Sequence, residues 1–107
     1  MAKNLINIAI LGSTGSIGTQ ALEIIKCFPE KFNVLALVNN NNSKILEKQI
    51  KFFRPKYVFT NSKINYADLG IKKLTINEIC SNPEIDIVIA GISGIESTSS
   101  VYTSIKH

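Results

Sequence analysis

Three glycines spaced three residues apart form the motif of this sequence that is best suited to chemistry. Gly12, Gly15 and Gly18 follow a short apolar run and precede a segment with helical periodicity. Glycine at such a turn permits positive φ and lets the backbone approach a ligand closely. The helix that begins there directs free N–H groups and a positive dipole end at the same point. This glycine loop (residues 12–18) therefore predicts a cradle for a pyrophosphate, in which Gly18 lets the helix pack tightly on the strand.

A mononucleotide P-loop and a purely structural turn are the two alternatives to a dinucleotide cradle at the glycine loop. The P-loop requires a lysine directly after its last glycine, whereas Thr19 follows here, so the sequence excludes it. The glycines could also serve only a tight strand-to-helix turn, although Ser13, Thr14 and Ser16 supply more hydrogen-bonding groups than a bare turn requires. The spacing differs from the G-x-G-x-x-G motif of common dinucleotide-binding folds. The assignment of a dinucleotide cradle therefore depends on the position of the loop between a strand and a helix.

Four consecutive asparagines, residues 39–42, follow the second apolar run and indicate the type of cofactor. An NAD-selective site places Asp or Glu there, about 20 residues beyond the glycines, to bind the ribose 2′-hydroxyl. This asparagine tract has no carboxylate that would repel a 2′-phosphate, and it offers amide donors, with Lys44 close behind. The tract favours NADP over NAD. The alternative is a solvated loop, because asparagine readily occupies turns.

The surrounding segments predict the elements that position these residues. Short apolar, mostly β-branched runs at residues 5–11, 32–38, 56–60 and 85–90 are typical of buried strands in a parallel sheet. Helical spacing predicts helices up to Phe28, before Pro29, and over residues 45–53, with Ser43 as the N-cap. Residues 61–70 are expected to be loop, 71–76 briefly extended, 76–80 a helical turn and 96–107 a helix. Right-handed crossovers then predict an α/β fold, a Rossmann-like open parallel sheet with helices on both faces.

Composition and charge exclude several other classes of protein. The 107 residues are 45% hydrophobic and 19% charged, which suits one small domain and excludes a disordered segment. No run approaches the roughly 18 apolar residues of a membrane span, and the start is unlike a signal peptide. The net charge of +4 is spread along the chain, and aromatic residues such as Phe28 and Phe52 occupy positions typical of a core. We therefore expect neither a nucleic-acid partner nor a membrane partner.

Cysteine and histidine usage limits the chemistry further. Cys27 and Cys80 form no C-x-x-C motif, so no metal site is expected, and a reduced, cytoplasmic setting is favoured. The single histidine, His107, is the last residue. A histidine-based catalytic centre within this chain is therefore not expected.

Several segments taken together resemble one enzyme family. The string I-L-G-S-T-G-S-I-G at residues 10–18 is followed by P-E-K-F at 29–32, V-L-A-L-V at 34–38 and R-P-K-Y at 54–57. This series resembles the amino-terminal domain of the 1-deoxy-D-xylulose 5-phosphate reductoisomerase family, and residues 85–94 resemble its next strand and glycine turn. The resemblance implies that residues 1–107 are an NAD(P)-binding domain, incomplete relative to the full enzyme, whose catalytic and carboxy-terminal domains would follow.

The resemblance also implies a function and a set of site residues. Members are NADPH-dependent oxidoreductases that convert 1-deoxy-D-xylulose 5-phosphate to 2-C-methyl-D-erythritol 4-phosphate in non-mevalonate isoprenoid biosynthesis, with Mg²⁺ or Mn²⁺, and the full enzyme is expected to be a homodimer. The cofactor-binding residues carried over by position are Gly12, Thr14, Gly15, Ser16, Ile17, Gly18, Asn40, Asn41 and Asn42.

Two segments of the sequence depart from the family pattern. Asn42 matches the third position of the family's G-K-N segment, but Asn40 and Asn41 do not, and the lost lysine reduces the expected affinity for a 2′-phosphate unless Lys44 takes its place. Residues 95–97 read I-E-S where the family has A-A-G.

The resemblance assigns no catalytic or metal-binding residue to this chain. The family's L-A-N-K-E segment and its acidic metal ligands would lie beyond residue 107, so the chain alone is expected to be inactive. Two alternatives remain open at this point. One is the cofactor domain of another NADP-dependent dehydrogenase, such as the aspartate-semialdehyde dehydrogenase group. The other is a non-catalytic, truncated nucleotide-binding remnant.

Overall fold

A computed structural model describes residues 5–93 and 99–105 of the chain, as strands and helices in alternation and then a final pair of strands. The elements are β1 (Ile6–Leu11), α1 (Ser16–Ile25), β2 (Phe32–Val38), α2 (Ser43–Phe53), β3 (Tyr57–Phe59), α3 (Tyr66–Leu69), β4 (Lys72–Lys73), α4 (Ile76–Cys80), β5 (Ile87–Ser93) and β6 (Ser99–Ile105).

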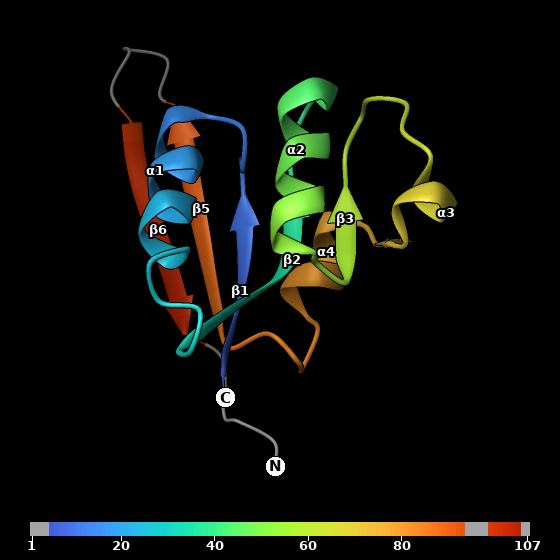
Figure 1. Ribbon diagram of the computed structural model, residues 1–107. Coiled ribbons are helices and arrows are strands. Elements are labelled where there is room, and N and C mark those ends of the chain that lie inside the picture. Colours follow the sequence, from blue (N-terminus) through green and yellow to red (C-terminus); the bar gives the residue numbers. More distant parts are fainter. Residues whose placement is uncertain (1–4, 94–98, 106–107) are drawn as a thin grey trace.

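The strands form one sheet in the order β4-β3-β2-β1-β5-β6 (Figure 1). Neighbouring strands from β4 to β5 are parallel, and β6 pairs with β5 in the antiparallel direction. The chain leaves β1 toward β2 on one side and later places β5 on the other side. The strand order therefore reverses at β1, and the crevice at the carboxyl ends of such strands is where open α/β sheets bind ligands.

Helices cover both faces of the sheet, which confirms the Rossmann-like α/β fold. The first apolar core lies between the sheet and the pair α1 and α2, and it includes Ile10, Leu37 and Leu46, none of them more than 1% exposed. The second core lies on the other face, where Ile79 of α4 packs with Leu35 and Ala36 of β2. Figure 1 shows α1 and α2 in front of the sheet and α4 behind it. Strands buried on both faces account for the nearly continuous apolar runs.

The helix boundaries differ in three places from those predicted. Helix α1 ends at Ile25, because the N–H groups of Cys27 and Phe28 bond carbonyls only three residues back and tighten the last turn. Asn42, and not Ser43, caps α2, since its Oδ1 accepts the Ile45 N–H at 3.3 Å. The segment expected to be loop contains the short helix α3, which is capped by Asn65 and followed by Gly70 in the left-handed region at φ 68°.

The helix expected over residues 96–107 is wrong, because residues 99–105 form strand β6. The segment S-S-V-Y-T-S-I is rich in Ser, Thr and β-branched residues, which have low helix propensity and suit a strand. The edge of β5 offers an open ladder of backbone groups, which β6 pairs along its whole length. The predicted turn at Gly94 and the departure at residues 95–97 lie outside the described residues, as do positions 106 and 107.

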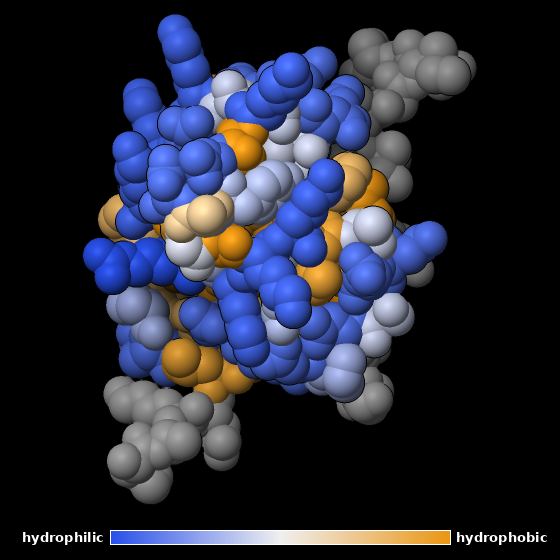
Figure 2. Space-filling view, turned by 90° about the vertical axis from the view of Figure 1, so that its right-hand side faces the viewer, coloured by the Kyte–Doolittle hydropathy of each residue, from blue (hydrophilic) through white to orange (hydrophobic). Residues whose placement is uncertain are grey.

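The opposite edge of the sheet is polar. Strand β4 is only two residues long, and both of its lysines are exposed, which discourages pairing with another chain. Figure 2 views this side of the molecule and shows mostly hydrophilic side chains with small, separate hydrophobic patches. Phe28 and Phe52 were expected in the core, but they are 40% and 66% exposed and do not belong to it.

Candidate functional site

The glycine loop begins with a sharp turn at the end of β1. Gly12 has φ 83°, a left-handed conformation that glycine adopts without strain. The N–H groups of Gly12 and Ser13 both donate to the carbonyl of Val38, at 2.7 and 2.9 Å, and the Gly15 N–H donates to the Gly12 carbonyl at 3.1 Å. These bonds hold the loop against the carboxyl end of β2.

Gly18 is the residue that lets α1 begin so close to this turn. A Cβ at position 18 would overlap the carbonyl oxygen of Gly12 and lie 2.8 Å from the Cα of Ser13. The close packing predicted for Gly18 is therefore confirmed, but the strand is not the partner that was expected. The partner is the backbone of the loop itself.

Gly15 is the N-cap of α1 and leaves the start of that helix open. It supplies no side-chain cap, and the first intrahelical bond runs from the Thr19 N–H to the Gly15 carbonyl at 2.9 Å. The N–H groups of Ser16, Ile17 and Gly18 precede that bond, as at the start of any α-helix. No acidic residue lies in the first turn. The helix therefore presents N–H donors and a positive dipole end, which suit an anion.

Gly15 does not use the positive φ that glycine permits at such a turn, because its φ is −81° and its ψ is 175°. A Cβ there would meet only the Gly12 carbonyl oxygen, at an ordinary 3.5 Å. Glycine at position 15 is thus not required by the backbone conformation. Its effect is to keep the space in front of the helix N-terminus free of a side chain.

Asn39, which was not among the predicted site residues, joins the glycine loop to the asparagine tract. Only 3% of this residue is exposed. Its Nδ2 donates to the Asn42 carbonyl at 2.9 Å and reaches the Thr14 hydroxyl at 3.4 Å. The signal in the sequence was its position directly after a buried strand. The sequence could not show that its amide faces inward while its three neighbours are exposed.

Gln49 of α2 is a second residue that was not among the predicted site residues. It is buried, and its Nε2 donates to the Ser13 carbonyl at 2.7 Å, which ties α2 to the glycine loop. Ser13 Oγ, Asn39 Oδ1 and Gln49 Oε1 are buried without a hydrogen-bond partner among the described residues. Unsatisfied polar atoms in such a place are expected where a ligand or ordered water completes the bonding.

The three predicted residues of the asparagine tract have separate local roles. Asn40 pairs with Asn61, which follows β3: Asn61 Nδ2 donates to Asn40 Oδ1 and the Asn61 N–H donates to the Asn40 carbonyl, both at 2.8 Å. Asn41 is exposed, and Asn42 caps α2. Lys44 is exposed in the first turn of α2.

A crevice of about 370 Å³ lies at the carboxyl ends of β1, β2 and β3 and beside Ala90 of β5, which pairs with Leu11. It is lined by Leu11, Gly12, Val38, Asn39, Asn40, Phe59, Asn61, Ile76 and Ala90. The structure thus brings the first glycine of the loop and the first predicted residue of the tract to one crevice, with an apolar floor. Thr14, Ser16, Ile17 and Asn41 do not line it.

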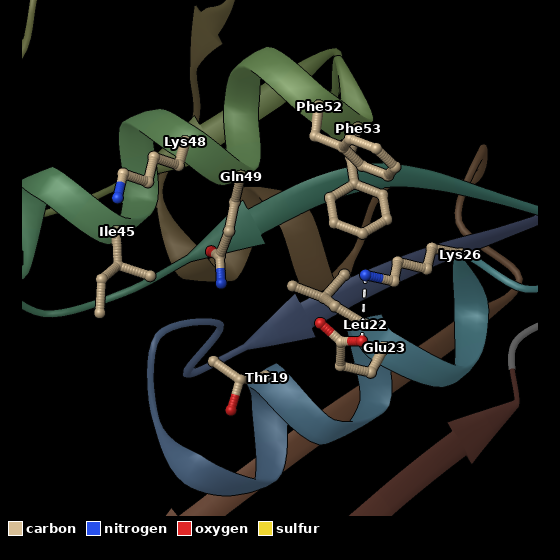
Figure 3. A pocket seen from close by; sticks show the side chains of 9 residues that line it. All are labelled: Thr19, Leu22, Glu23, Lys26, Ile45, Lys48, Gln49, Phe52 and Phe53. Atoms are coloured by element: carbon tan, nitrogen blue, oxygen red, sulfur yellow. Dashed lines mark ion pairs between the residues drawn. The ribbon is translucent and has the colours of Figure 1, made fainter.

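A second hollow, of about 260 Å³, lies between α1 and α2 (Figure 3). Leu22 and Phe53 form part of its apolar lining, and Glu23 and Lys26 form an ion pair at 3.0 Å on its rim. None of the strand ends lines this hollow. It is a groove between helices rather than the crevice of the sheet.

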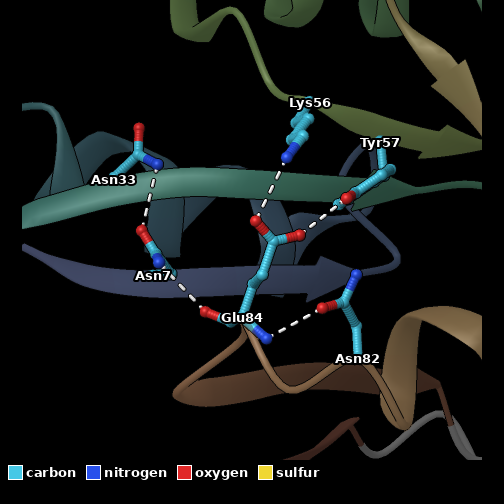
Figure 4. A network of polar contacts seen from close by, with 6 residues as sticks. All are labelled: Asn7, Asn33, Lys56, Tyr57, Asn82 and Glu84. Atoms are coloured by element: carbon cyan, nitrogen blue, oxygen red, sulfur yellow. Dashed lines mark hydrogen bonds and ion pairs between the residues drawn. The ribbon is translucent and has the colours of Figure 1, made fainter.

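A polar network joins the opposite, amino-terminal ends of the strands (Figure 4). The Tyr57 hydroxyl donates to Glu84 at 2.6 Å, and the Lys56 ammonium lies 3.1 Å from the other carboxylate oxygen. The hydrogen bonds from Tyr57 and Lys56 lower the pKa of Glu84, and the same carboxylate raises the pKa of Lys56. The network is far along the strands from the glycine loop, so we assign it a structural role.

Within the described residues, no group of three or more His, Cys, Asp or Glu side chains is placed to hold a metal ion. Nor is any helix in that part of the chain long and apolar enough to cross a membrane.

Comparisons of this chain with known proteins all point to one family. Residues 8–107 match the sequence profile described as 1-deoxy-D-xylulose 5-phosphate reductoisomerase. The enzymes of that name from Microcystis aeruginosa and Thermodesulfovibrio yellowstonii are 43% and 42% identical, over 82% and 94% of this chain. The chain spans only 21% and 29% of their lengths.

Solved structures show the same relationship. A structure of DOX-P reductoisomerase in complex with magnesium matches with a TM-score of 0.71 and 32% identity, over 88% of this chain and 26% of that one. A second, in complex with NADPH, fosmidomycin and magnesium, matches with a TM-score of 0.67 and 32% identity, over 78% and 24%.

Proposed function

Because the chain belongs to the 1-deoxy-D-xylulose 5-phosphate reductoisomerase family, we propose that its glycine loop and asparagine tract together bind NADPH. The observation that carries this proposal is the open N-terminus of α1, which has glycine as its N-cap and no acidic residue in its first turn. The N–H groups of Ser16 and Ile17 would hold the cofactor's pyrophosphate, which a helix N-terminus favours. A relative of known structure binds NADPH in this family, which supports the assignment.

The residues around the crevice fit the remainder of the cofactor. The apolar floor at Val38, Phe59 and Ile76 suits a planar heterocycle, and the amides of Asn40 and Asn61 line its edge. No carboxylate stands at the end of β2 to bind a 2′-hydroxyl or to repel a 2′-phosphate. This supports NADPH over NADH, with Asn40, Asn41 and Asn42 at the adenosine end.

The relatives are several times longer than this chain. We further propose that a protein of that length that contains these residues reduces and rearranges 1-deoxy-D-xylulose 5-phosphate to 2-C-methyl-D-erythritol 4-phosphate. When bound, NADPH supplies the hydride for such a reduction. The described residues would bind and orient the cofactor. Mg²⁺ or Mn²⁺ would be held outside them, since they offer no cluster of metal ligands. We expect a homodimer in the cytoplasm, and the two free cysteines, Cys27 and Cys80, support a reducing compartment.

The decisive test of the cofactor site is calorimetric titration of NADPH into the 107-residue chain and into Gly15→Val. We expect weak binding to the unchanged chain and no measurable binding to the variant, because the valine side chain would fill the space before the helix N-terminus. The extended backbone at position 15 accepts a β-branched residue, so the variant should keep its circular dichroism spectrum. Equal NADPH affinity of the two proteins would refute the cradle.

A further inference from the structure

The pairing of Asn40 with Asn61 joins the loops that follow β2 and β3, and it is better defined than exposed asparagines usually are. Two hydrogen bonds of 2.8 Å connect the residues, one from the Asn61 backbone N–H to the Asn40 carbonyl and one between the side-chain amides. The Thr60 hydroxyl donates to the same Asn40 carbonyl at 3.3 Å. Asn40 is therefore held by its backbone and by its side chain.

The direction of the amide–amide bond decides what Asn40 can offer to a ligand. Its Oδ1 accepts from Asn61 Nδ2, so its oxygen is engaged. The group that remains is the Nδ2 amino group, which carries two N–H donors and has no acceptor among the described residues. Asn40 is exposed, and both asparagines line the crevice beside Gly12 and Phe59. A side chain that could accept or donate is thereby turned into a donor.

We propose that Asn61 is a positioning residue that determines cofactor specificity by holding the Asn40 amide as a hydrogen-bond donor to the phosphate on the adenosine ribose. The inference rests on the proposed function of binding NADPH. It also accounts for how a tract without the lysine of related sequences could still prefer the phosphorylated cofactor. An amide whose orientation is already fixed loses less conformational entropy when it binds an anionic oxygen, so the hydrogen bond contributes more to affinity.

The first test compares NADPH and NADH binding to the 107-residue chain, Asn61→Asp and Asn61→Ala. Aspartate at position 61 can only accept, so it would turn the Asn40 amide round and direct its oxygen at the phosphate. We expect NADPH affinity to fall about tenfold in Asn61→Asp, the size of one lost hydrogen bond to a charged group, while NADH affinity changes little. In Asn61→Ala the Asn40 amide is free to rotate, and a loss of about threefold for NADPH alone is expected.

A double-mutant cycle separates positioning from simple repulsion by the new carboxylate. If Asn61 acts through Asn40, then Asn61→Ala has no further effect on NADPH affinity in an Asn40→Ala background. The matched control is Asn33→Ala, which removes a similar amide–amide bond, Asn33 Nδ2 to Asn7 Oδ1 at 3.1 Å, at the other end of the sheet. That control should leave the ratio of NADPH to NADH affinity unchanged.

The outcomes distinguish this inference from the function on which it rests. If the unchanged chain binds NADPH but Asn61→Ala keeps the same affinity ratio, the role of Asn61 is refuted and the cofactor site stands. Additive effects of Asn40→Ala and Asn61→Ala would also refute it. If the unchanged chain binds neither cofactor, the proposed function and the inference are overturned together.

Discussion

The three glycines of the loop act by three different physical mechanisms. Gly12 adopts a left-handed conformation that other residues rarely adopt. Gly18 leaves room for the backbone of the preceding turn, which a Cβ would overlap. Gly15 needs neither a positive φ nor the space of a missing Cβ, and it keeps the N-terminus of α1 open. Equal spacing in the sequence therefore conceals unequal tolerance to substitution.

A matched pair of alanine substitutions measures this difference. Gly18→Ala should destabilise the chain by about 2 kcal/mol, because the added methyl group forces α1 away from the Gly12 carbonyl. Gly15→Ala should cost less than about 1 kcal/mol, the effect of a poorer N-cap. Urea denaturation followed by circular dichroism gives both values. A Gly15→Ala variant that is the less stable of the two would contradict the assignment.

Asn39 and Gln49 show where residue-level reasoning from sequence stops. Asparagine in a tract is expected in solvent, and glutamine on a helix stripe is expected at its edge. Asn39 is buried because the glycine loop folds over the end of β2, and Gln49 because α2 packs against the same loop. Contacts between segments that are distant along the chain bury these side chains, and no local pattern records such contacts.

Among the elements, the strand ends opposite the glycine loop are joined by polar side chains rather than by apolar packing alone. Glu84 accepts hydrogen bonds from Tyr57 and Lys56, and its backbone carbonyl accepts from Asn7 Nδ2 at 2.9 Å. Asn33 in turn donates to Asn7 at 3.1 Å. Figure 4 shows this chain of contacts across β1, β2 and the start of β3. The network connects the amino-terminal ends of these strands.

The Glu84 carboxylate makes stability depend on pH in the acid range. Its pKa in the folded chain is lowered from the usual 4.5, first by the Tyr57 hydrogen bond and then by Lys56. The carboxylate therefore stabilises the fold at pH values above 4.5, and this contribution is lost as the pH falls through the lowered pKa. Glu84→Gln should flatten the acid limb of a plot of unfolding midpoint against pH.

The control for this experiment is Glu30→Gln, which changes an exposed glutamate in the turn before β2. It should leave the acid limb as it is. If Glu84→Gln and Glu30→Gln behave alike, the network does not contribute to acid stability.

Local sequence pattern predicted most elements correctly and failed at the carboxyl-terminal strand. Strand β2 and helix α4 have the predicted bounds, and β1, β3 and β4 differ only at their ends. The residues of β6 have weak preferences for either state, so the neighbouring edge of β5 decides the outcome through pairing. An open strand edge exists only once the sheet has formed, so the local sequence does not reveal it. The prediction of a helix over these residues was wrong for this reason.

At the scale of the whole molecule, the sheet order assembles a cofactor crevice from segments that are far apart. Leu11, Val38, Phe59 and Ala90 come from four strands. They meet because the parallel strands β1, β2 and β3 place their carboxyl ends at one edge and Ala90 of β5 pairs with Leu11. The described residues that line this crevice carry no ionisable side chain. The arrangement is suited to holding a cofactor.

We therefore expect the purified 107-residue chain to bind NADPH weakly and to form no product from 1-deoxy-D-xylulose 5-phosphate in the presence of NADPH and Mg²⁺. The reason is that, under the proposed function, the residues of the glycine loop and the asparagine tract would bind and orient the cofactor and take no part in the reaction. Incubation followed by chromatographic analysis for 2-C-methyl-D-erythritol 4-phosphate checks this. Detectable product would mean that the chain contains catalytic residues that we have not identified.

The glycine loop, the parallel α/β architecture and the resemblance to the reductoisomerases could be predicted from the amino-acid sequence, because they depend on short patterns of residue type along the chain. Three features became visible only in the folded chain: which amides face inward, the pairing of Asn61 with Asn40, and the strand formed by residues 99–105. These features depend on surfaces that come together only when the sheet forms. The free energy of burying or pairing a group is set by those surfaces rather than by its neighbours in sequence.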